Sequence, residues 1–378
     1  MSGILRIATI GDLHLNHRKN SVDVTISALN KYVTNERVFR TIDYLFIEGD
    51  VFDTLMDVSD PKLPSILRWV NRALYLAAKH NVGVRVLEGT GLHDRKQSHI
   101  FVSTGVNLEK MGLHVDIKYI STVSVETLPC GKVIAYVPDE MGPPDATVHI
   151  LKTELSKLGI EKADLALMHG AFKYQLPMID HPMSHDEQIY RELINGPVFI
   201  GHIHTYTTKY NIIATGSFDR CRQDEEEAKG YTITEVNLSD GSFTTEFIEN
   251  KLAHRYVGIH ISSFELADVF IEIANKLSKL NLPDGANVCV YTTKGSLIPS
   301  NMVLLRDRYP FYHWDFIIKD VKKENTDANK VAMFTKRQYT PLVLNGETLP
   351  TLTAQRLKDI GSDPSILKRC MGLLSECL

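Results

Sequence analysis

The chain has 378 residues, of which 43% are hydrophobic and 23% are charged, and its formal net charge is −4 at pH 7. This composition is typical of a folded soluble protein, and at this length we expect one large domain with one or two smaller ones. The charge excludes a global cationic field, so a nucleic acid would have to be held by local patches or by metal ions. The five cysteines form no CxxC pair, which favours a reducing cytoplasm over a disulfide framework or a thiolate zinc site.

Short apolar runs rich in β-branched residues recur along the chain, and each is followed at once by polar residues. These runs are LRIATI (5–10), YLFI (44–47), VRVL (84–87), LALM (165–168) and VFI (198–200). Runs of this kind predict buried strands. Helical patterns lie between them, for example over residues 21–42 and 59–81, the second with Asp60-Pro61 as a start signal. Strands that alternate with helices predict an α/β layer.

The pattern changes further along the chain. From about Ile212 short strands are separated by turn signals, among them Ser239-Asp240-Gly241, which would extend the sheet. A small α+β unit and then a polar stretch with a helical tail come next, so we expect domains at 1–250, 251–325 and 326–378. The tail could equally pack on its own protein or dock a partner. The apolar start is too short for a signal sequence and no run reaches ~18 apolar residues, so we expect neither export nor a membrane span.

Six polar residues stand directly after the predicted strands, and His93 with Asp94 follows the run VRVL in the same way. The six are Asp12, His14, Asp50, His169, His202 and His204. If the strands share a direction, their ends meet at one rim, where α/β sheets usually bind ligands. Two carboxylates and four imidazoles together, without a thiolate or a nucleophilic serine, suit divalent metals such as manganese, iron or zinc. A carboxylate shared by two ions about 4 Å apart would suit Asp50.

The motifs GDLHL (11–15), GDVFD (49–53), GLHD (91–94), HG (169–170) and GHIH (201–204) together resemble the calcineurin-like metallophosphoesterase superfamily. Within it, the chain is most similar to the SbcD-type DNA repair and recombination nucleases, whose members include phage proteins. The stretch GSFDRCRQDEEEAKGY (216–231) resembles the segment located after the last metal histidines in that family. The resemblance implies a four-layer αββα sandwich with a smaller α+β capping domain that covers DNA, and then a helical C-terminal tail.

Carried over residue by residue, the resemblance implies that Asp12, His14 and His204 hold one metal ion, Asp50 bridges, and His169 and His202 hold the other. It further implies that His93 protonates the leaving oxygen while Asp94 fixes its tautomer. The ions, most simply Mn²⁺, would activate a water that hydrolyses a DNA phosphodiester without a covalent intermediate. The implied partners are DNA, an SbcC-type ATPase and a second copy of the chain, in the cytoplasm of a bacterium or a phage-infected host.

Two positions depart from the family pattern. The residue before the motif histidine is usually an asparagine that binds the second metal, and here it is Leu92, which cannot coordinate. Asp53 stands where some relatives have histidine, and a solvated loop carboxylate is an equally good interpretation. Because of Leu92 we expect a weaker second metal site that is completed by water or substrate. The alternatives are a non-catalytic DNA clamp that regulates the ATPase, and a small-molecule phosphodiesterase or phosphatase.

Seven cations lie near the motifs in sequence and are candidates for contact with the DNA backbone. They are Arg18, Lys19, Arg95, Lys96, Lys173, Arg220 and Arg222. Each could equally be a solvated surface charge. The acidic run Glu225 to Glu227 is more typical of an exposed loop than of a site.

Overall fold

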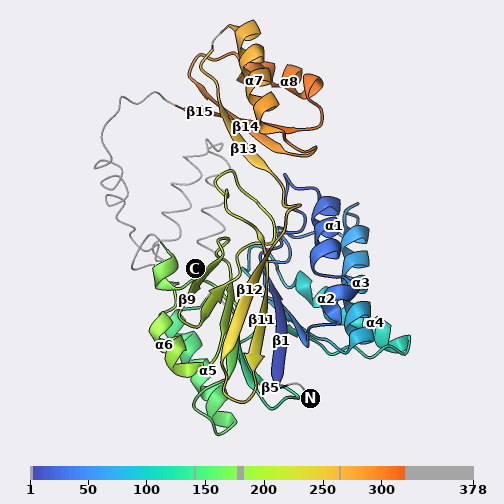
Figure 1. The fold of residues 1–378 in the computed structure, drawn as a ribbon, viewed down its shortest axis with the longest axis vertical. Coiled ribbons are helices and arrows are strands. Elements are labelled where there is room, and N and C mark those ends of the chain that lie inside the picture. The colour runs from blue at the N-terminus through green and yellow to red at the C-terminus, as the bar shows by residue number, and fades with distance from the viewer. Residues whose placement is uncertain (1–2, 140–141, 177–182, 264, 320–378) are drawn as a thin grey trace, which may run out of the picture. The chain divides into compact units, whose positions relative to one another are not determined.

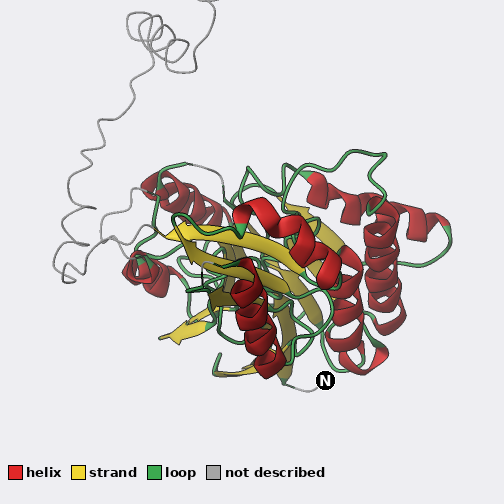
Figure 2. Cartoon of the chain, turned by 90° about the horizontal axis from the view of Figure 1, so that it is seen from above, coloured by secondary structure: helices red, strands yellow, loops and turns green. Residues whose placement is uncertain are grey.

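The computed structural model describes residues 3–139, 142–176, 183–263 and 265–319. Its main part contains two six-stranded sheets, and a third, three-stranded sheet comes later in the chain. Strand orders are β12-β11-β1-β2-β3-β4 in the first sheet and β5-β6-β7-β8-β10-β9 in the second. Figures 1 and 2 show the strands of the two large sheets gathered between two groups of helices.

In the first sheet, β1 to β4 run parallel to one another, β11 pairs antiparallel with β1, and β12 pairs antiparallel with β11. The strands are β1 (Ile4–Ile10), β2 (Tyr44–Ile47), β3 (Gly83–Leu87), β4 (Ile117–Ile120), β11 (Gly230–Asn237) and β12 (Phe243–Glu249). In the second sheet β6, β7, β8 and β10 are parallel. Its strands are β5 (Ser124–Thr127), β6 (Val133–Val137), β7 (Leu165–His169), β8 (Val198–Gly201), β9 (Thr207–Lys209) and β10 (Ile212–Ala214).

The helices cover the outer faces of the two sheets. They are α1 (Val22–Tyr32), α2 (Glu36–Phe39), α3 (Leu63–His80), α4 (Ile100–Lys110), α5 (Pro144–Lys157) and α6 (Glu187–Leu193), with short 3₁₀ turns η1 (Gln97–His99) and η2 (Lys173–Gln175). In Figure 1, α1 to α4 lie on the side of the first sheet and α5 and α6 on the side of the second. The predicted α/β sandwich with four αββα layers is confirmed.

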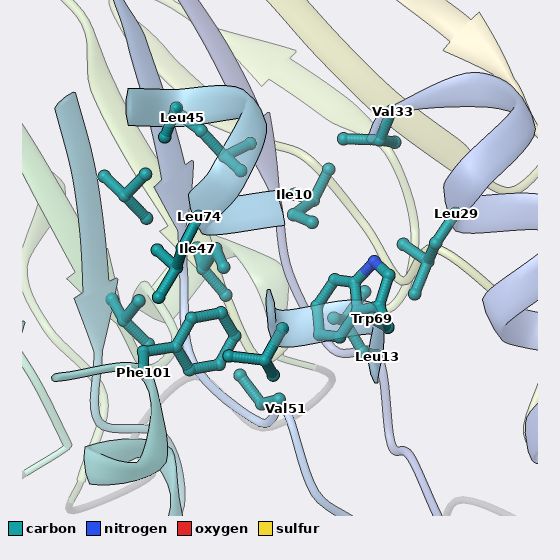
Figure 3. Close-up of a cluster of buried hydrophobic side chains, with 14 of the residues drawn as sticks. Ile10, Leu13, Leu29, Val33, Leu45, Ile47, Val51, Trp69, Leu74 and Phe101 are labelled. Carbon is teal, nitrogen blue, oxygen red and sulfur yellow. The ribbon is translucent and has the colours of Figure 1, made fainter. Parts of the chain in front are cut away.

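Side-chain alternation along the strands separates the layers. In β2, Leu45 and Ile47 pack with the helices of the first layer, while Phe46 points into the space between the sheets. In β7, Leu167 shares that inner space and Met168 packs on the opposite face. Successive strand residues point to opposite faces, so a strand apolar on both sides is buried on both sides. Figure 3 shows the outer cluster of the first sheet, with Trp69 and Phe101 among the side chains from α3 and α4.

The predicted elements occur where the sequence indicated, with two differences in the helices. All five apolar runs form strands. The pattern over 21–42 forms two helices, because Asn35 accepts a hydrogen bond from the Val38 amide and caps a new helix. The pattern over 59–81 begins its helix at Leu63, after a turn in which Asp60 accepts a hydrogen bond from the Lys62 amide.

The third sheet has its own hydrophobic cluster, which includes Ile273 and Trp314. It consists of β13 (Tyr256–His260), β14 (Asn287–Thr293) and β15 (His313–Lys319), with α7 (Leu266–Leu280), η3 (Pro299–Asn301) and α8 (Met302–Arg308). The predicted boundaries near 250 and 325 stay predictions, and the predicted tail falls outside the described residues. Among the helices of the described part of the chain, none has the length and apolar content needed to cross a lipid bilayer.

Candidate metal centre

The loops that come after five parallel strands bring carboxylates and imidazoles together at one rim of the sandwich. The structure contains three overlapping groups of possible metal ligands: Asp12, His14 and His204; His14, Asp50 and His93; and Asp50, His169 and His202. Within each group the ligand atoms lie within 4.8 Å of one another. The structure therefore brings together all six residues that the sequence placed after strands, and the groups are linked through His14 and Asp50.

Several of these residues have a backbone conformation that side chains other than glycine rarely adopt. The φ angles are 49° for Asp12, 44° for His14, 48° for Asp50 and 96° for His202. Left-handed backbone costs free energy and persists where the surrounding structure imposes it, commonly at functional sites. Four such residues in one cluster indicate that the loops are shaped to present these side chains.

The first group, Asp12, His14 and His204, combines residues from both large sheets. The Nε2 atoms of His14 and His204 lie 3.1 Å apart. The Asp12 carboxylate accepts hydrogen bonds from the His202 amide, with N–O distances of 2.9 and 3.1 Å. Asp12 therefore joins the loop after β1 to the loop after β8 while it stays buried beside the two imidazoles.

In the second group, which comprises Asp50, His169 and His202, a main-chain carbonyl fixes the orientation of His169. His169 Nδ1 donates a hydrogen bond to the Glu48 carbonyl at 2.6 Å, so His169 Nε2 faces Asp50 Oδ1 at 3.5 Å. Burial alone would raise the pKa of Asp50, but the adjacent His169 outweighs it and lowers that pKa. In the metal-free site, burial and His169 lower the pKa of His202, whereas Asp50 outweighs burial and raises the pKa of His169 to about 10. A bound ion would displace the proton from His169 Nε2.

The donors fit divalent metal ions. Two donors that bind the same ion at about 2.0–2.2 Å are about 3.0–3.4 Å apart, and the His14 and His204 nitrogens, 3.1 Å apart, meet this condition. Imidazole and carboxylate are ligands of zinc, manganese and iron. Asp12, His14 and His204 would hold one ion, His169 and His202 the other, and Asp50 would lie between them.

His93 lies at the edge of this centre, and its orientation corrects one expectation. Its Nδ1 atom donates a hydrogen bond to the Asp53 carbonyl at 2.7 Å. Asp94, which we expected to fix the tautomer of His93, instead accepts hydrogen bonds from the amides of Phe52 and Gly89, each at 2.9 Å. Asp94 thus joins the loops after β2 and β3. Each oxygen of its buried carboxyl group accepts one main-chain hydrogen bond, and neither oxygen is hydrogen-bonded to His93.

Asp53 is placed by the structure closer to the chemistry than the sequence suggested. Its Oδ1 atom lies 3.4 Å from His14 Nδ1 and 3.9 Å from His93 Nδ1. Burial would raise the pKa of Asp53, but the contact with His14 lowers it overall, so the carboxylate is ionised beside two imidazoles. Asp53 therefore lies on the side of His14 opposite to the first metal group.

Glu225 is a functional residue that sequence reasoning missed. Its Oε1 atom lies 2.5 Å from His204 Nδ1, and its Oε2 atom accepts a hydrogen bond from the Cys221 amide. Burial raises the pKa of Glu225, but the contacts with His204 and Lys229 outweigh it and bring that pKa to about 2. A carboxylate on the second ring nitrogen fixes the orientation of a metal-binding histidine. The sequence of the acidic run did not predict this role, because its members differ in burial: Glu225 is buried, Glu226 is exposed and Glu227 is half-buried beside Lys229.

Substitution of Glu225 by glutamine tests this orientation. We expect Glu225→Gln to weaken one class of Mn²⁺ site by about 10- to 100-fold, because His204 loses the charged partner of Nδ1. Equilibrium dialysis with Mn²⁺ measures the change, and Glu226→Gln in the same acidic run is the matched control. Equal Mn²⁺ affinities for the two variants would contradict the role of Glu225.

Three of the seven cations predicted to contact DNA are engaged by other groups of the protein. The guanidinium of Arg220 donates to the carbonyls of Glu225, Glu227 and His254, so this arginine braces the loop, and its contact with a phosphate stays a prediction. Ion pairs engage Lys19 with Asp315 and Lys173 with Asp186.

The other four predicted cations lie at the surface. Arg222 is 3.6 Å from Glu225, the Nε atom of Arg95 donates to the Leu92 carbonyl, and Arg18 and Lys96 are exposed. These four remain candidates for contact with a polyanion.

Two cavities flank the centre. One, of about 650 Å³, is lined by His14, His93 and His204 together with the loop around Glu225. The other, of about 520 Å³, lies beside His169 and His202, and the side chain of Leu92 is part of its wall. Leu92 is 66% exposed and lines this cavity together with His169 and His202.

The comparisons with known proteins add little to this geometry. No protein-family model and no curated protein matches the chain. A solved structure described as TT1561 of Thermus thermophilus aligns with 65% of this chain and 99% of its own, at 10% identity and a TM-score of 0.37. A second solved structure aligns over the same shares at 12% identity and the same TM-score. Since such TM-scores do not establish a shared fold, the assignment of the site rests on its side chains.

Proposed function

We propose that the chain is a metal-dependent nuclease that hydrolyses phosphodiester bonds of DNA with two divalent ions, most simply Mn²⁺. The observation that carries this proposal is the set of three overlapping ligand groups linked by His14 and Asp50 at one rim. A linked pair of sites with a shared carboxylate is the arrangement used by two-metal phosphodiesterases. The motifs that resemble SbcD-type nucleases support DNA as the substrate.

The bound ions would lower the pKa of a water and neutralise charge on the phosphoryl oxygens. His93 would supply the proton for the leaving oxygen. Its Nδ1–H is held by the Asp53 carbonyl, so any further proton is carried on Nε2, the nitrogen that remains for the substrate. Because His93 lines the larger cavity, a phosphodiester there would have the ligand groups on one side and a proton donor on the other.

The partners are part of the same proposal. An SbcC-type ATPase and a second copy of this chain are implied by the resemblance alone, as is the cytoplasmic setting. The exposed cations near the motifs, Arg18, Arg95, Lys96 and Arg222, are the candidates for contact with the DNA backbone.

One second function is favoured by a specific observation. Since residue 92 is a leucine, the second ion lacks the asparagine donor of the family, which suits a non-catalytic DNA clamp that regulates the ATPase. A small-molecule phosphodiesterase is the other alternative.

Degradation of end-labelled linear DNA in Mn²⁺ tests the proposal. We expect the wild type to degrade the DNA and His93→Ala to lower the rate by about 10²- to 10⁴-fold, the usual range for loss of a general acid. His114→Ala is the matched control, because the side chain of His114 is 84% exposed. Mn²⁺ binding to His93→Ala should stay close to wild type.

The outcomes separate the alternatives. DNA that stays intact with and without the ATPase, while a small phosphodiester is cleaved well, would contradict the nuclease proposal. DNA that is bound while neither substrate is cleaved would favour the clamp.

A further inference from the structure

We infer that the hydroxyl of Thr90 is a protein donor to the second metal ion, and that it supplies the oxygen ligand that Leu92 cannot provide. This inference rests on the proposed two-metal site. Thr90 Oγ1 lies 3.3 Å from Asp50 Oδ2, 3.3 Å from His169 Nε2 and 3.4 Å from His202 Nδ1. One hydroxyl is therefore nearly equidistant from a donor atom of each member of the second group.

These separations favour a shared ion over a simple hydrogen bond. A hydroxyl has one proton and would be drawn close to one acceptor, at about 2.7–2.8 Å for another oxygen. Thr90 Oγ1 instead keeps three partners at 3.3–3.4 Å. Donors that bind one ion at about 2.0–2.2 Å are about 3.0–3.4 Å apart. The separations of Thr90 Oγ1 from all three partners thus match the spacing of donors in a single coordination sphere.

The backbone holds Thr90 in this place. Its amide donates to Asp50 Oδ1 at 2.6 Å, and its carbonyl accepts from the amides of His93 and Asp94. The preceding residue, Gly89, lies so close to Asp50 that a Cβ atom would come within 2.1 Å of the Asp50 nitrogen. Glycine at this position therefore allows the loop after β3 to approach the loop after β2, which delivers the hydroxyl to the ligands.

The turn at residues 90–94 also explains why a leucine is tolerated at position 92. Hydrogen bonds from two amides to the Thr90 carbonyl fold residues 90–94 into a tight turn, and Leu92 lies at its outer side with 66% of its surface exposed. An asparagine donor at position 92 is thus replaced by a hydroxyl donor at position 90. Threonine suits this role, because Ser and Thr hydroxyls bind divalent cations in phosphoryl-transfer enzymes.

Titration with Mn²⁺ tests the inference without any need for activity. We expect two classes of site in the wild type and in Thr90→Ser, with affinities that agree within about threefold. In Thr90→Val one class should weaken by about 10-fold or more, because the hydroxyl is lost and the volume is kept. Thr147→Val is the matched control, since Thr147 lines the same cavity from α5.

A spectroscopic test distinguishes a ligand from a residue that only positions ligands. In Thr90→Cys loaded with Co²⁺, a thiolate bound to the ion adds a charge-transfer band in the near ultraviolet that the wild type lacks. The control variant Val106→Cys should add no such band, because Val106 is an exposed residue of α4 outside the ligand groups. A circular dichroism spectrum like that of the wild type verifies that each variant is folded.

Two results would overturn the inference. They are a Co²⁺ spectrum of Thr90→Cys identical to that of the wild type, and unchanged Mn²⁺ affinities in Thr90→Val. Both are distinguishable from failure of the proposed function, in which the wild type itself would bind fewer than two Mn²⁺ ions under saturating conditions.

Discussion

Replacement of Asp50 by asparagine is expected to remove both metal ions and to reduce DNA degradation to the level without enzyme. Asp50 belongs to two of the three ligand groups, with Oδ1 at 3.5 Å from His169 Nε2 and Oδ2 at 4.0 Å from His14 Nε2. Asparagine keeps the size of the side chain but loses its charge and one of its two oxygens. Because both ions depend on this carboxylate, the loss should exceed about 100-fold in Mn²⁺ affinity at each site.

Equilibrium dialysis with Mn²⁺, together with the DNA assay, measures this effect. Asp240→Asn is a suitable control, since Asp240 lies in the turn between β11 and β12 and is fully exposed to solvent. If Asp50→Asn still bound two ions with wild-type affinity, the shared role of Asp50 would be refuted. Loss of only one ion would mean that Asp50 belongs to a single site.

The strands were predictable because local pattern decides them. Runs such as YLFI are apolar on both faces, and the structure buries Phe46 between the sheets and Leu45 under the helices. The order of the strands was not predictable in this way. β11 pairs with β1 across more than 200 residues of sequence, and such a pairing depends on the packing of the whole domain. The break between α1 and α2 depends on one capping residue, Asn35.

In the candidate site, too, some residues could be predicted from local sequence pattern and others could not. Residues at or just after the ends of parallel strands, such as His169 and Asp12, could be predicted to meet, because the ends of such strands lie at one rim. Residues whose roles depend on how a loop folds could not be assigned. Glu225 turns inward from an acidic run, and Arg220 bends back onto the carbonyls of its own loop. Thr90 reaches the ligands only because Gly89 lets two loops approach.

The role of Asp94 leads to the second large effect, a pH dependence of stability. Burial and the nearby charge of Asp50 raise the pKa of Asp94 to about 7, against the opposing hydrogen bonds from Phe52 and Gly89. A carboxyl whose pKa is higher in the folded state than in the unfolded state stabilises the fold below its unfolded pKa of about 3.9, and this contribution is lost as the pH rises through the folded pKa. We therefore expect Asp94 to stabilise the metal-free protein least above about pH 7.

The comparison of wild type with Asp94→Asn isolates this contribution, because asparagine does not titrate and the other groups are common to both proteins. We expect the free energy of unfolding of the wild type, relative to the variant, to fall by up to about 1.4 kcal/mol per pH unit between about pH 4 and pH 7 and to level off above. Urea denaturation in the presence of a chelator measures this difference at each pH.

The direction of the change decides between the two roles of Asp94. An aspartate that acted as the charged partner of His93 would have a lowered pKa, and the free energy of unfolding of the wild type, relative to the variant, would then increase as the pH rises. For a carboxyl group buried against the amides of Phe52 and Gly89, this relative free energy of unfolding decreases as the pH rises. Asp57→Asn provides a control of opposite sign, because hydrogen bonds from Ser59 lower the pKa of the exposed Asp57 carboxyl. Its stabilising contribution is present above the unfolded pKa and is lost as the pH falls.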